Sequence, residues 1–373
     1  MSAAAAAAQR RRVAFFLQDL SGGGAERVMV RLANGMAAAG LDVVMLLVRR
    51  EGPLLDVLSP AVRVEASPGR RTLWSTPWLV GQLRRERPDA LLSALPHINL
   101  IAILAARLAG HRARIVPTQH NERKAWDDPA FPLIRIAYRL GPLLYPLADN
   151  VVAVSGGVAA SLSWPPWLAR KVRVIHNPIV EPTLPALAAA PCAHPWLAPG
   201  QPPVLLAVGR LAPAKDFATL LQALDLVRRE RPVRLIILGE GSQRPELERL
   251  RAKLGLEAAA DLPGWVENPF ALMSRAALLV QSSVYEGLPT VLVEALACGT
   301  PVVATHCSAG SAEILGDGRY GRLVPMRDPA ALAAAVLAAL AEPAPVELLR
   351  QRAQEFTVER AVARYRALLF GEE

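Results

Sequence analysis

Residues 278–305 read LLVQSSVYEGLPTVLVEALACGTPVVAT, and this stretch decides the fold. An apolar run at 278–280 and a β-branched run at 302–305 flank a helical pattern at 290–298. Two buried strands that are joined by one helix form a βαβ unit, whose strands lie parallel in one sheet. The stretch therefore predicts an α/β protein in which helices cover a parallel sheet.

The same alternation extends over both halves of the chain, and most of the further strand candidates are short runs rich in apolar and β-branched residues. Strands are expected at 13–17, 43–48, 90–93, 114–118, 150–154, 204–208 and 234–238. Helices are expected near 26–39, 71–87, 99–109, 131–148, 216–231, 244–254, 329–341 and 358–370. This rhythm is typical of doubly wound sheets, in which ligands bind beyond the carboxyl ends of the strands.

A segment rich in proline separates the two series of strands. Eight of the 26 residues at 178–203 are proline, which is a linker composition. A chain of 373 residues also exceeds one ordinary core, so we expect two Rossmann-like doubly wound domains facing each other across a cleft. The expected divisions are a disordered tail at 1–9, an N-terminal domain at 10–178, a linker at 179–203, a C-terminal domain at 204–356, and a final segment at 357–373 whose helix packs back on the N-terminal domain.

The net charge of +9 is confined to the N-terminal half. Residues 1–185 hold 23 basic and 13 acidic residues, whereas residues 186–373 hold 19 and 20. A basic surface of this size suits phosphate-rich ligands, anionic lipid or nucleic acid. A general preference for arginine, which outnumbers lysine 38 to 4, is the alternative interpretation.

Cysteine and hydropathy patterns favour a cytoplasmic protein. Cys192, Cys298 and Cys307 form no CxxC pair, as expected of free thiols in a reducing compartment. The sequence contains no run of about 18 apolar residues that would span a membrane. It also shows neither a zinc-site spacing nor an aromatic–basic interleaving, so a nucleic-acid partner is not expected.

Glycine-rich turns follow expected strands in both halves. Gly23 and Gly24 open the first helix, where bare backbone and free N–H groups can approach an anion. Gly239 and Gly241 stand in the same position after the strand at 234–238. The alternative interpretation of each pair is an ordinary tight turn between a strand and a helix.

Two cations share the loop that follows the strand at 204–208. Arg210, directly after Gly209, and Lys215 stand five positions apart. The planar fork of arginine and the mobile point charge of lysine together suit a diphosphate. A lysine at a helix start is unfavourable unless an anion lies near it, which favours binding over a solvated charge.

Two carboxylates flank the start of the helix at 290–298. Glu286 precedes it on a loop, and Glu294 lies within its otherwise apolar first turns. Carboxylates accept hydrogen bonds from paired hydroxyls, as sugar or ribose binding requires. An unpaired Glu294 in such surroundings would be costly, so a partner is implied. The segment between the two carboxylates leads into a helix N-terminus, another anion site: Gly287, Leu288, Pro289 and Thr290.

Together these motifs resemble the retaining glycosyltransferases of family 4, which have the GT-B fold. The resemblance rests on the glycine loop at 22–27, on 209–216, and on the Glu-x7-Glu block at 286–294, and it spans roughly residues 12–370 in order. It implies an enzyme that moves a sugar from a UDP- or GDP-sugar to an acceptor hydroxyl with retention. The implied acceptor is a lipid-linked glycan or a surface polysaccharide precursor.

The resemblance also implies a role for each motif. Arg210 and Lys215 would bind the donor diphosphate and stabilise the leaving group. Glu294 would accept hydrogen bonds from the ribose hydroxyls, and Glu286 would contact hydroxyls of the transferred sugar. The glycines named above would bring backbone to the ligand. His120, which follows the strand at 114–118, matches a residue that contacts the donor sugar, with a structural loop histidine as the alternative.

Metal and cofactor requirements follow from what the motifs contain. No Asp-x-Asp pair occurs, so the usual carboxylate clamp for a metal-bound diphosphate is missing. We expect Arg210 and Lys215 to neutralise the diphosphate instead, with no metal and no cofactor beyond the donor. His97 also follows an expected strand, and a structural role is favoured for it.

The acceptor is expected to bind the basic N-terminal domain. Residues 131–146 form an amphipathic stretch that would dock on anionic lipid at the inner membrane face, although a core-facing helix is the favoured alternative. Such docking would weaken with salt. A soluble acceptor, or an epimerase or phosphorylase of the same fold, remains an alternative. The basic residues assigned to this surface are Arg70, Arg71, Arg84, Arg85, Arg135 and Arg139.

Overall fold

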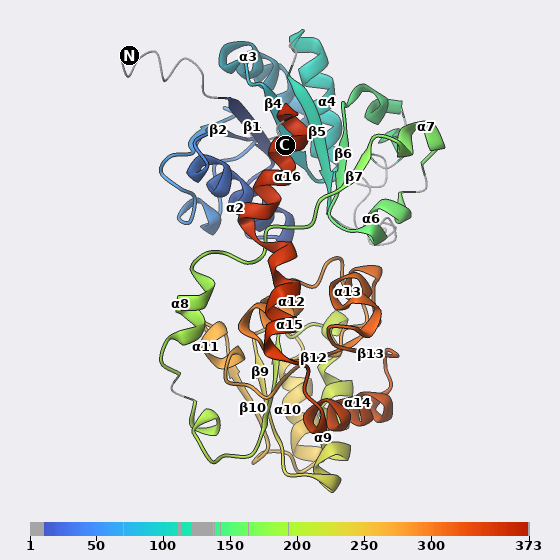
Figure 1. The fold of residues 1–373 in the computed structure, drawn as a ribbon. Helices are drawn as coiled ribbons and strands as arrows, with labels where there is room; N and C mark the ends of the chain where they lie inside the picture. Colours follow the sequence, from blue (N-terminus) through green and yellow to red (C-terminus); the bar gives the residue numbers. More distant parts are fainter. Residues whose placement is uncertain are drawn as a thin grey trace. The chain divides into compact units, whose positions relative to one another are not determined.

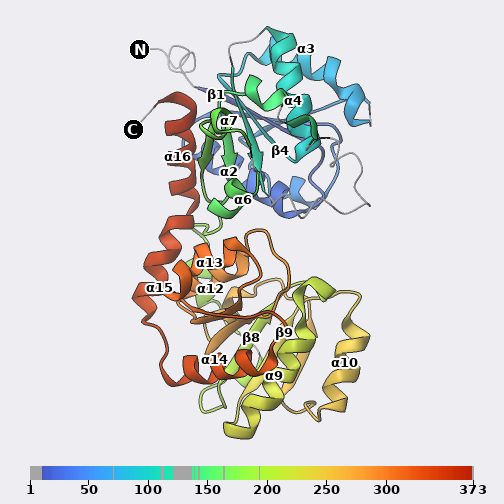
Figure 2. The same cartoon turned by 90° about the vertical axis from the view of Figure 1, so that its right-hand side faces the viewer.

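The computed structural model describes residues 11–69, 71–110, 113–120, 137, 139–141, 143–162, 164–192 and 194–371. These residues form two compact units. The first unit comprises the chain up to Pro178 together with Val358 onward, and the second comprises Ile179–Thr357. Each unit is a parallel sheet with helices on both faces, as Figures 1 and 2 show. The tail predicted at 1–9 lies outside the described residues.

The first unit contains a seven-stranded sheet in the order β3-β2-β1-β4-β5-β6-β7. Every neighbouring pair is parallel. The strands are β1 (Arg12–Leu17), β2 (Asp42–Leu47), β3 (Arg63–Ala66), β4 (Ala90–Ala94), β5 (Arg114–Gln119), β6 (Val151–Ala153) and β7 (Val172–Val174). The order reverses between β1 and β4, and ligands bind at such a reversal in doubly wound sheets.

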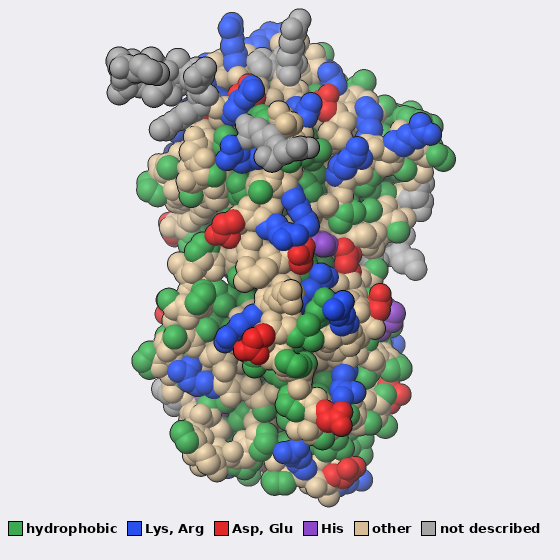
Figure 3. All heavy atoms as spheres, viewed as in Figure 1, with side chains coloured by type: hydrophobic (Ala, Val, Ile, Leu, Met, Phe, Trp, Pro, Cys, Tyr) green, Lys and Arg blue, Asp and Glu red, His purple; other side chains and the backbone are tan. Residues whose placement is uncertain are grey.

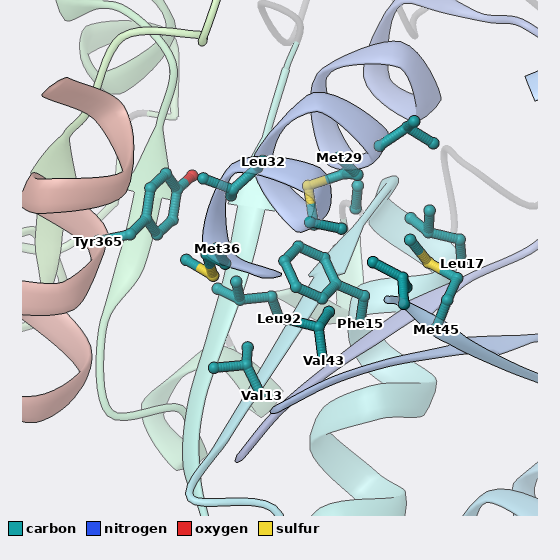
Figure 4. Packing of buried hydrophobic residues seen from close by; sticks show 14 of the residues in the cluster. Val13, Phe15, Leu17, Met29, Leu32, Met36, Val43, Met45, Leu92 and Tyr365 are labelled. Carbon is teal, nitrogen blue, oxygen red and sulfur yellow. The ribbon is translucent and has the colours of Figure 1, made fainter. Parts of the chain in front are cut away.

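Two apolar layers hold helices on the faces of this sheet, with α2 and α16 on one face and α3 and α4 on the other. The final helix lies against α2, where a Cβ on Gly35 would be 2.5 Å from Val358 Cγ1. Figure 4 shows Tyr365 of α16 directed toward this layer. The helices are α2 (Gly24–Ala38), α3 (Thr76–Glu86), α4 (Pro96–Ala109), α6 (Gly156–Ser161), α7 (Pro166–Ala169) and α16 (Val358–Phe370), with short 3-10 turns η1 (Pro53–Leu55), η2 (Thr72–Ser75) and η4 (Tyr145–Leu147).

The second unit contains a six-stranded parallel sheet in the order β10-β9-β8-β11-β12-β13. Its strands are β8 (Val204–Val208), β9 (Arg234–Leu238), β10 (Ala260–Gly264), β11 (Leu278–Gln281), β12 (Val302–Thr305) and β13 (Arg322–Val324). Its helices are α8 (Leu184–Ala189), α9 (Phe217–Glu230), α10 (Arg244–Lys253), α11 (Phe270–Met273), α12 (Thr290–Cys298), α13 (Ala309–Leu315), α14 (Pro329–Ala341) and α15 (Val346–Ala353), with turns η5 (Pro195–Leu197), η6 (Pro213–Lys215), η7 (Gly316–Gly318) and η8 (Gln354–Phe356).

The segment predicted as a linker, 179–203, is part of the second unit. Ile179, Val180 and Leu184 are buried in its core. The backbone N–H groups of Ile179 and Val180 both donate to the carbonyl of Phe356, at 2.8 and 3.0 Å. The linker prediction was wrong because apolar residues between the prolines supply buried contacts, which outweigh the local signal of proline composition.

Among the described residues, no single helix is long and apolar enough to cross a membrane. The helical segments 329–341 and 346–356 pass that test of length and composition only as a pair, across a bend of 115°.

Candidate functional site

Loops after neighbouring strands of the second unit are tied together at the carboxyl edge of its sheet. Gly209, directly after β8, donates its backbone N–H to Leu238 O at 2.9 Å, and Leu211 donates to Glu240 O at 2.8 Å. Gly239 has a φ of 136°, and a Cβ there would lie 2.0 Å from Gly209 O. Only glycine permits this approach, so these loops present bare backbone at the edge.

Lys215 and Glu286, which are 71 residues apart in the chain, form an ion pair at this edge. Their side chains are 23% and 15% exposed. The aliphatic stem of Lys215 lies across Gly209, where a Cβ would be 3.1 Å from Cε. Asp216 adopts a left-handed conformation after η6 and caps α9 through Thr219, so the chain turns sharply after the lysine. The cation is thereby held over the glycine turn rather than released into solvent.

Buried polar groups at the end of β11 hold the carboxylate of Glu286. Ser283 Oγ donates to Glu286 Oε1 at 2.8 Å, and Gln281 Nε2 donates to the same oxygen at 3.3 Å. Ser282 donates instead to the backbone carbonyl of Lys215 at 2.8 Å. These three polar side chains are at most 5% exposed. Oε1 of Glu286 therefore accepts hydrogen bonds from Lys215 and from two neutral donors. The loop that carries Lys215 is also held by Ser282.

The remaining predicted donor residues of the second unit lie on the loop after β8, on the loop before α12 and on α12 itself. Arg210 is exposed, and its guanidinium makes no hydrogen bond or ion pair with the part of the chain that the structure describes. Glu294 is partly buried on α12 and is engaged in an interaction. The loop that leads into α12 is packed tightly, because a Cβ on Gly310 would lie 2.5 Å from Gly287 O. Thr290 begins α12 directly after this loop.

The glycine loop of the first unit directs the N-terminus of α2 toward the carboxyl edge of β1. Gly23 is the N-cap and supplies no side-chain cap. A Cβ there would be 2.2 Å from Glu26 Oε2, so this carboxylate folds back over the helix start. Burial raises the pKa of Glu26, against a hydrogen bond to its own backbone. The sequence analysis did not select Glu26 as a site residue, although it lies within the glycine loop at 22–27.

Two histidines follow neighbouring strands of the first unit. His97 begins α4 after β4, and its Nε2 lies 2.8 Å from Gln18 Oε1. His120 follows β5, and its Nε2 lies 2.8 Å from Thr118 Oγ1. Burial lowers the pKa of both rings, that of His120 to about 4. Both imidazoles are therefore neutral at pH 7, and they follow two strands, β4 and β5, that pair directly.

Two of the arginines that the sequence assigned to a membrane surface bind neighbouring groups of the first unit instead. Arg84 donates to the carbonyls of Leu108 and Ala109, at 2.9 and 3.3 Å, at the end of α4. Arg85 forms ion pairs with Glu65 and Glu86, both at 3.2 Å. Arg71 and Arg139 are exposed. Arg70 and Arg135, with half of the predicted amphipathic stretch, lie outside the described residues.

No cluster of three or more His, Cys, Asp or Glu side chains within the described ranges is suited to hold a metal ion. The expected independence of metal remains a prediction.

Two matches to known families cover most of both units. Residues 22–181 match the family described as Glycosyltransferase Family 4. Residues 202–342 match the family described as Glycosyl transferases group 1. The chain belongs to these glycosyltransferases.

Two relatives of this glycosyltransferase are named for lipopolysaccharide core biosynthesis and for sugar transfer to a diphospho-undecaprenol substrate. The lipopolysaccharide core biosynthesis glycosyltransferase LpsE of Rhizobium meliloti is 28% identical over 340 residues, which cover 90% of this chain and 91% of LpsE. An N-acetylgalactosaminyltransferase of Campylobacter jejuni, named for a diphospho-undecaprenol substrate, is 33% identical over 236 residues. That match covers 61% of this chain and 60% of the relative.

Solved structures confirm the fold that the sequence predicted for this glycosyltransferase. HepE of Anabaena, crystallised with UDP, has a TM-score of 0.79 at 21% identity over 97% of this chain and 100% of HepE. The lipopolysaccharide outer core galactosyltransferase WaaB has a TM-score of 0.73 at 19% identity, covering 96% and 99% of the two chains. Two Rossmann-like parallel-sheet units of the GT-B class are therefore established.

Proposed function

We propose that this glycosyltransferase moves a sugar, with retention, from a UDP- or GDP-sugar to a hydroxyl of a lipid-linked glycan or surface polysaccharide precursor. The names of LpsE and the Campylobacter enzyme support the acceptor class, and the UDP and UDP-glucose complexes of HepE support the donor class. The observation that carries the proposal is the ion pair of Glu286 with Lys215, which lies on the same loop as Arg210, whose guanidinium makes no hydrogen bond or ion pair with the described residues.

The ion pair supports a role for Lys215 in binding the diphosphate. Without donor, the lysine is neutralised by Glu286. A diphosphate has a greater negative charge than one carboxylate, so it would draw Lys215 away and would also attract Arg210. Negative charge on the diphosphate grows as the bond to the anomeric carbon breaks, so both cations stabilise the transition state more than the ground state. No metal is needed for this step in the proposed mechanism.

The carboxylates complete the donor site. Once Lys215 is drawn to the diphosphate, Glu286 still holds the hydrogen bonds from Ser283 and Gln281, and its second oxygen can accept from hydroxyls of the transferred sugar. Glu294 would accept from the ribose hydroxyls. Gly239 and Gly241 pack closely against the carbonyls of Gly209 and Leu211, so these turns carry no side chain that would block the phosphates.

A panel of nucleotide sugars in buffer with a chelator tests the donor proposal. A UDP- or GDP-sugar at 100 times its dissociation constant should stabilise the chain by about 2.7 kcal/mol. It should also be consumed only when a glycan acceptor is present. A donor that is epimerised, or consumed by phosphate without an acceptor product, would favour the epimerase or phosphorylase alternative.

An apolar surface flanked by arginines supports the membrane part of the proposal. In the first unit, Arg107 of α4 donates to Leu147 O at 2.9 Å, which joins α4 to the turn η4. Leucines stand exposed on these two elements and the segment before η4, and basic side chains gather on the surface of this unit in Figure 3. These leucines are Leu104, Leu108, Leu140, Leu143 and Leu147, which are 41–71% exposed. Such a surface suits an anionic bilayer that presents a lipid-linked acceptor.

Flotation with vesicles tests this part separately. We expect binding to vesicles that contain anionic lipid at low ionic strength, and release as salt is added. Replacing Leu108 and Leu143 by serine should weaken binding without loss of activity on a soluble acceptor analogue. Absence of binding at low ionic strength would favour a soluble acceptor.

A further inference from the structure

A layer of buried polar side chains runs beneath His120 in the first unit. Asn99 of α4 donates to Thr118 O at 2.9 Å and to the hydroxyl of Tyr145 at 3.2 Å, and its Oδ1 accepts from Ser93 at 2.8 Å. Gln119 donates to the same tyrosine hydroxyl. All five side chains are at most 2% exposed. Burying this many polar groups costs free energy unless each finds partners, and apolar residues would pack here more simply.

The layer fixes both the backbone and the hydroxyl of Thr118. Its carbonyl accepts a hydrogen bond from the Asn99 side chain, and its hydroxyl donates one to Ser93 O at 2.8 Å. A hydroxyl has one proton, so a second strong hydrogen bond to the same oxygen must be accepted. Besides this carbonyl, the described residues offer the hydroxyl the thioether of Met29 at 3.9 Å, which is a weak acceptor.

The contact at 2.8 Å between Thr118 Oγ1 and His120 Nε2 therefore has one direction. Since the threonine proton is already given to Ser93 O, Nε2 must carry a proton and donate it to the hydroxyl. A neutral imidazole holds one proton, so Nδ1 is left with a lone pair. His120 makes no other hydrogen bond with the described residues, so this acceptor is available to a ligand.

We propose that Thr118 is a positioning residue that locks His120 in the Nε2–H tautomer, so that Nδ1 accepts a hydrogen bond from a hydroxyl of the transferred sugar. The role of Nδ1 rests on the proposed function, whereas the tautomer rests on the fold alone. An acceptor lone pair selects an O–H group. It discriminates against a sugar with no hydroxyl at that carbon, and against a uronic acid that places a carboxylate there.

The lowered pKa of His120 agrees with this assignment. Burial holds the ring neutral down to about pH 4, so the lone pair on Nδ1 persists throughout the physiological range. The first unit therefore offers a neutral acceptor at the end of β5, which suits a sugar better than a phosphate.

Long-range nitrogen–proton correlation spectra of the histidine rings test the tautomer without any substrate. The chain has six histidines, and the signals of His120 are those that vanish in His120→Gln. We expect the Nε2–H pattern in the wild type at pH 7 and a shift toward the other tautomer in Thr118→Val. Thr118→Ser should restore the wild-type pattern. Ser93→Ala is the matched control, because it removes a hydroxyl from the same layer but keeps the Ser93 carbonyl.

Two results would overturn the lock: an Nδ1–H pattern in the wild type, or an unchanged pattern in Thr118→Val. The wild-type spectrum decides the first even if the valine variant does not fold.

The contact between Nδ1 and the sugar is tested with a series of monodeoxy donors. We expect one member to lose about tenfold in kcat/KM with the wild type, the worth of one hydrogen bond, and to lose less with Thr118→Val. A correct tautomer together with no turnover of any nucleotide sugar would refute the proposed function and leave the lock intact.

Discussion

The carboxyl edges of the two sheets differ in the groups that the sequence predicted to meet the donor, although the first edge also holds an ion pair between Asp19 and Arg49. In the second unit, a lysine and a glutamate form an ion pair over a glycine turn, and Arg210 on the same loop as the lysine makes no side-chain hydrogen bond or ion pair with the described residues. In the first unit, two imidazoles with lowered pKa values follow neighbouring strands. The nearly neutral half of the chain thus carries the charged site, and the half with all the excess charge carries neutral histidines at the corresponding edge.

Many charged residues of the first unit lie away from the histidines and pair with one another. Arg12, Asp42 and Arg63 begin the first three strands, at the edge opposite the histidines. Arg12 pairs with Asp42 at 2.5 Å, and Arg63 donates to the buried Glu86 at 2.9 Å. Burial alone would raise the pKa of Glu86, but Arg63 holds it below its ordinary value. Net charge therefore identifies a surface and a structural network, and it does not locate the site.

Removal of the Lys215 cation should produce the largest loss of activity. We expect Lys215→Ala to lower kcat by about 10²- to 10³-fold, as loss of one transition-state contact does. Lys253→Ala, which removes an exposed lysine from the end of α10 in the same unit, is the matched control and should retain full activity. Steady-state kinetics together with thermal unfolding separate catalysis from stability. Near-wild-type turnover by a folded Lys215→Ala would mean that the charged edge does not bind the diphosphate.

The neutral imidazole of His120 should make the stability of the protein depend on pH. The pKa of His120 falls from 6.5 to about 4 on folding, so the unfolded chain binds a proton that the folded chain refuses. Stability is complete above pH 6.5 and declines as pH falls toward 4, by about 3 kcal/mol in all. Urea unfolding of wild type and His120→Gln at several pH values should show this difference, whereas His306→Gln, an exposed control, should follow the wild type. Equal slopes for wild type and His120→Gln would contradict a buried neutral ring.

The neutral donors that hold Glu286 should contribute less to catalysis than the charge of Lys215. Ser283→Ala removes one of two neutral donors from Glu286 Oε1 and leaves the ion pair in place. We expect a loss of about tenfold in kcat/KM, the worth of one hydrogen bond to a partly buried carboxylate. Ser161→Ala, whose hydroxyl contacts a carbonyl in the first unit, provides a comparison. A loss as large as that of Lys215→Ala would show that positioning and charge are inseparable at this edge.

The central strands could be predicted from the sequence, because buried parallel strands are continuous apolar runs. The edge strands β3, β7, β10 and β13 could not, since their residues are mixed and all four lie at the ends of the sheets. The motif residues of the donor site were also predictable, but the ion pair between Lys215 and Glu286 was not, because it joins loops 71 residues apart. The roles of Thr118 and Ser283 depend on the direction of hydrogen bonds, which spacing along a chain does not encode.

Glu26 gives the smallest and most discriminating test of the contrast, because it is a carboxylate at the same edge as the histidines, near Asp19. Burial raises its pKa, so at pH 7 the folded state bears the cost of an ionised group. As pH falls through the raised pKa, the folded chain takes up the proton first, and stability rises, opposite in sign to the effect of His120. Glu26→Gln should therefore be slightly more stable than wild type at pH 7, by less than about 1 kcal/mol, and the gap should close near pH 4.5. Urea unfolding at both pH values measures it. A variant that is less stable at pH 7 would mean that the helix dipole of α2 outweighs burial, and that the first unit's edge holds a useful charge after all.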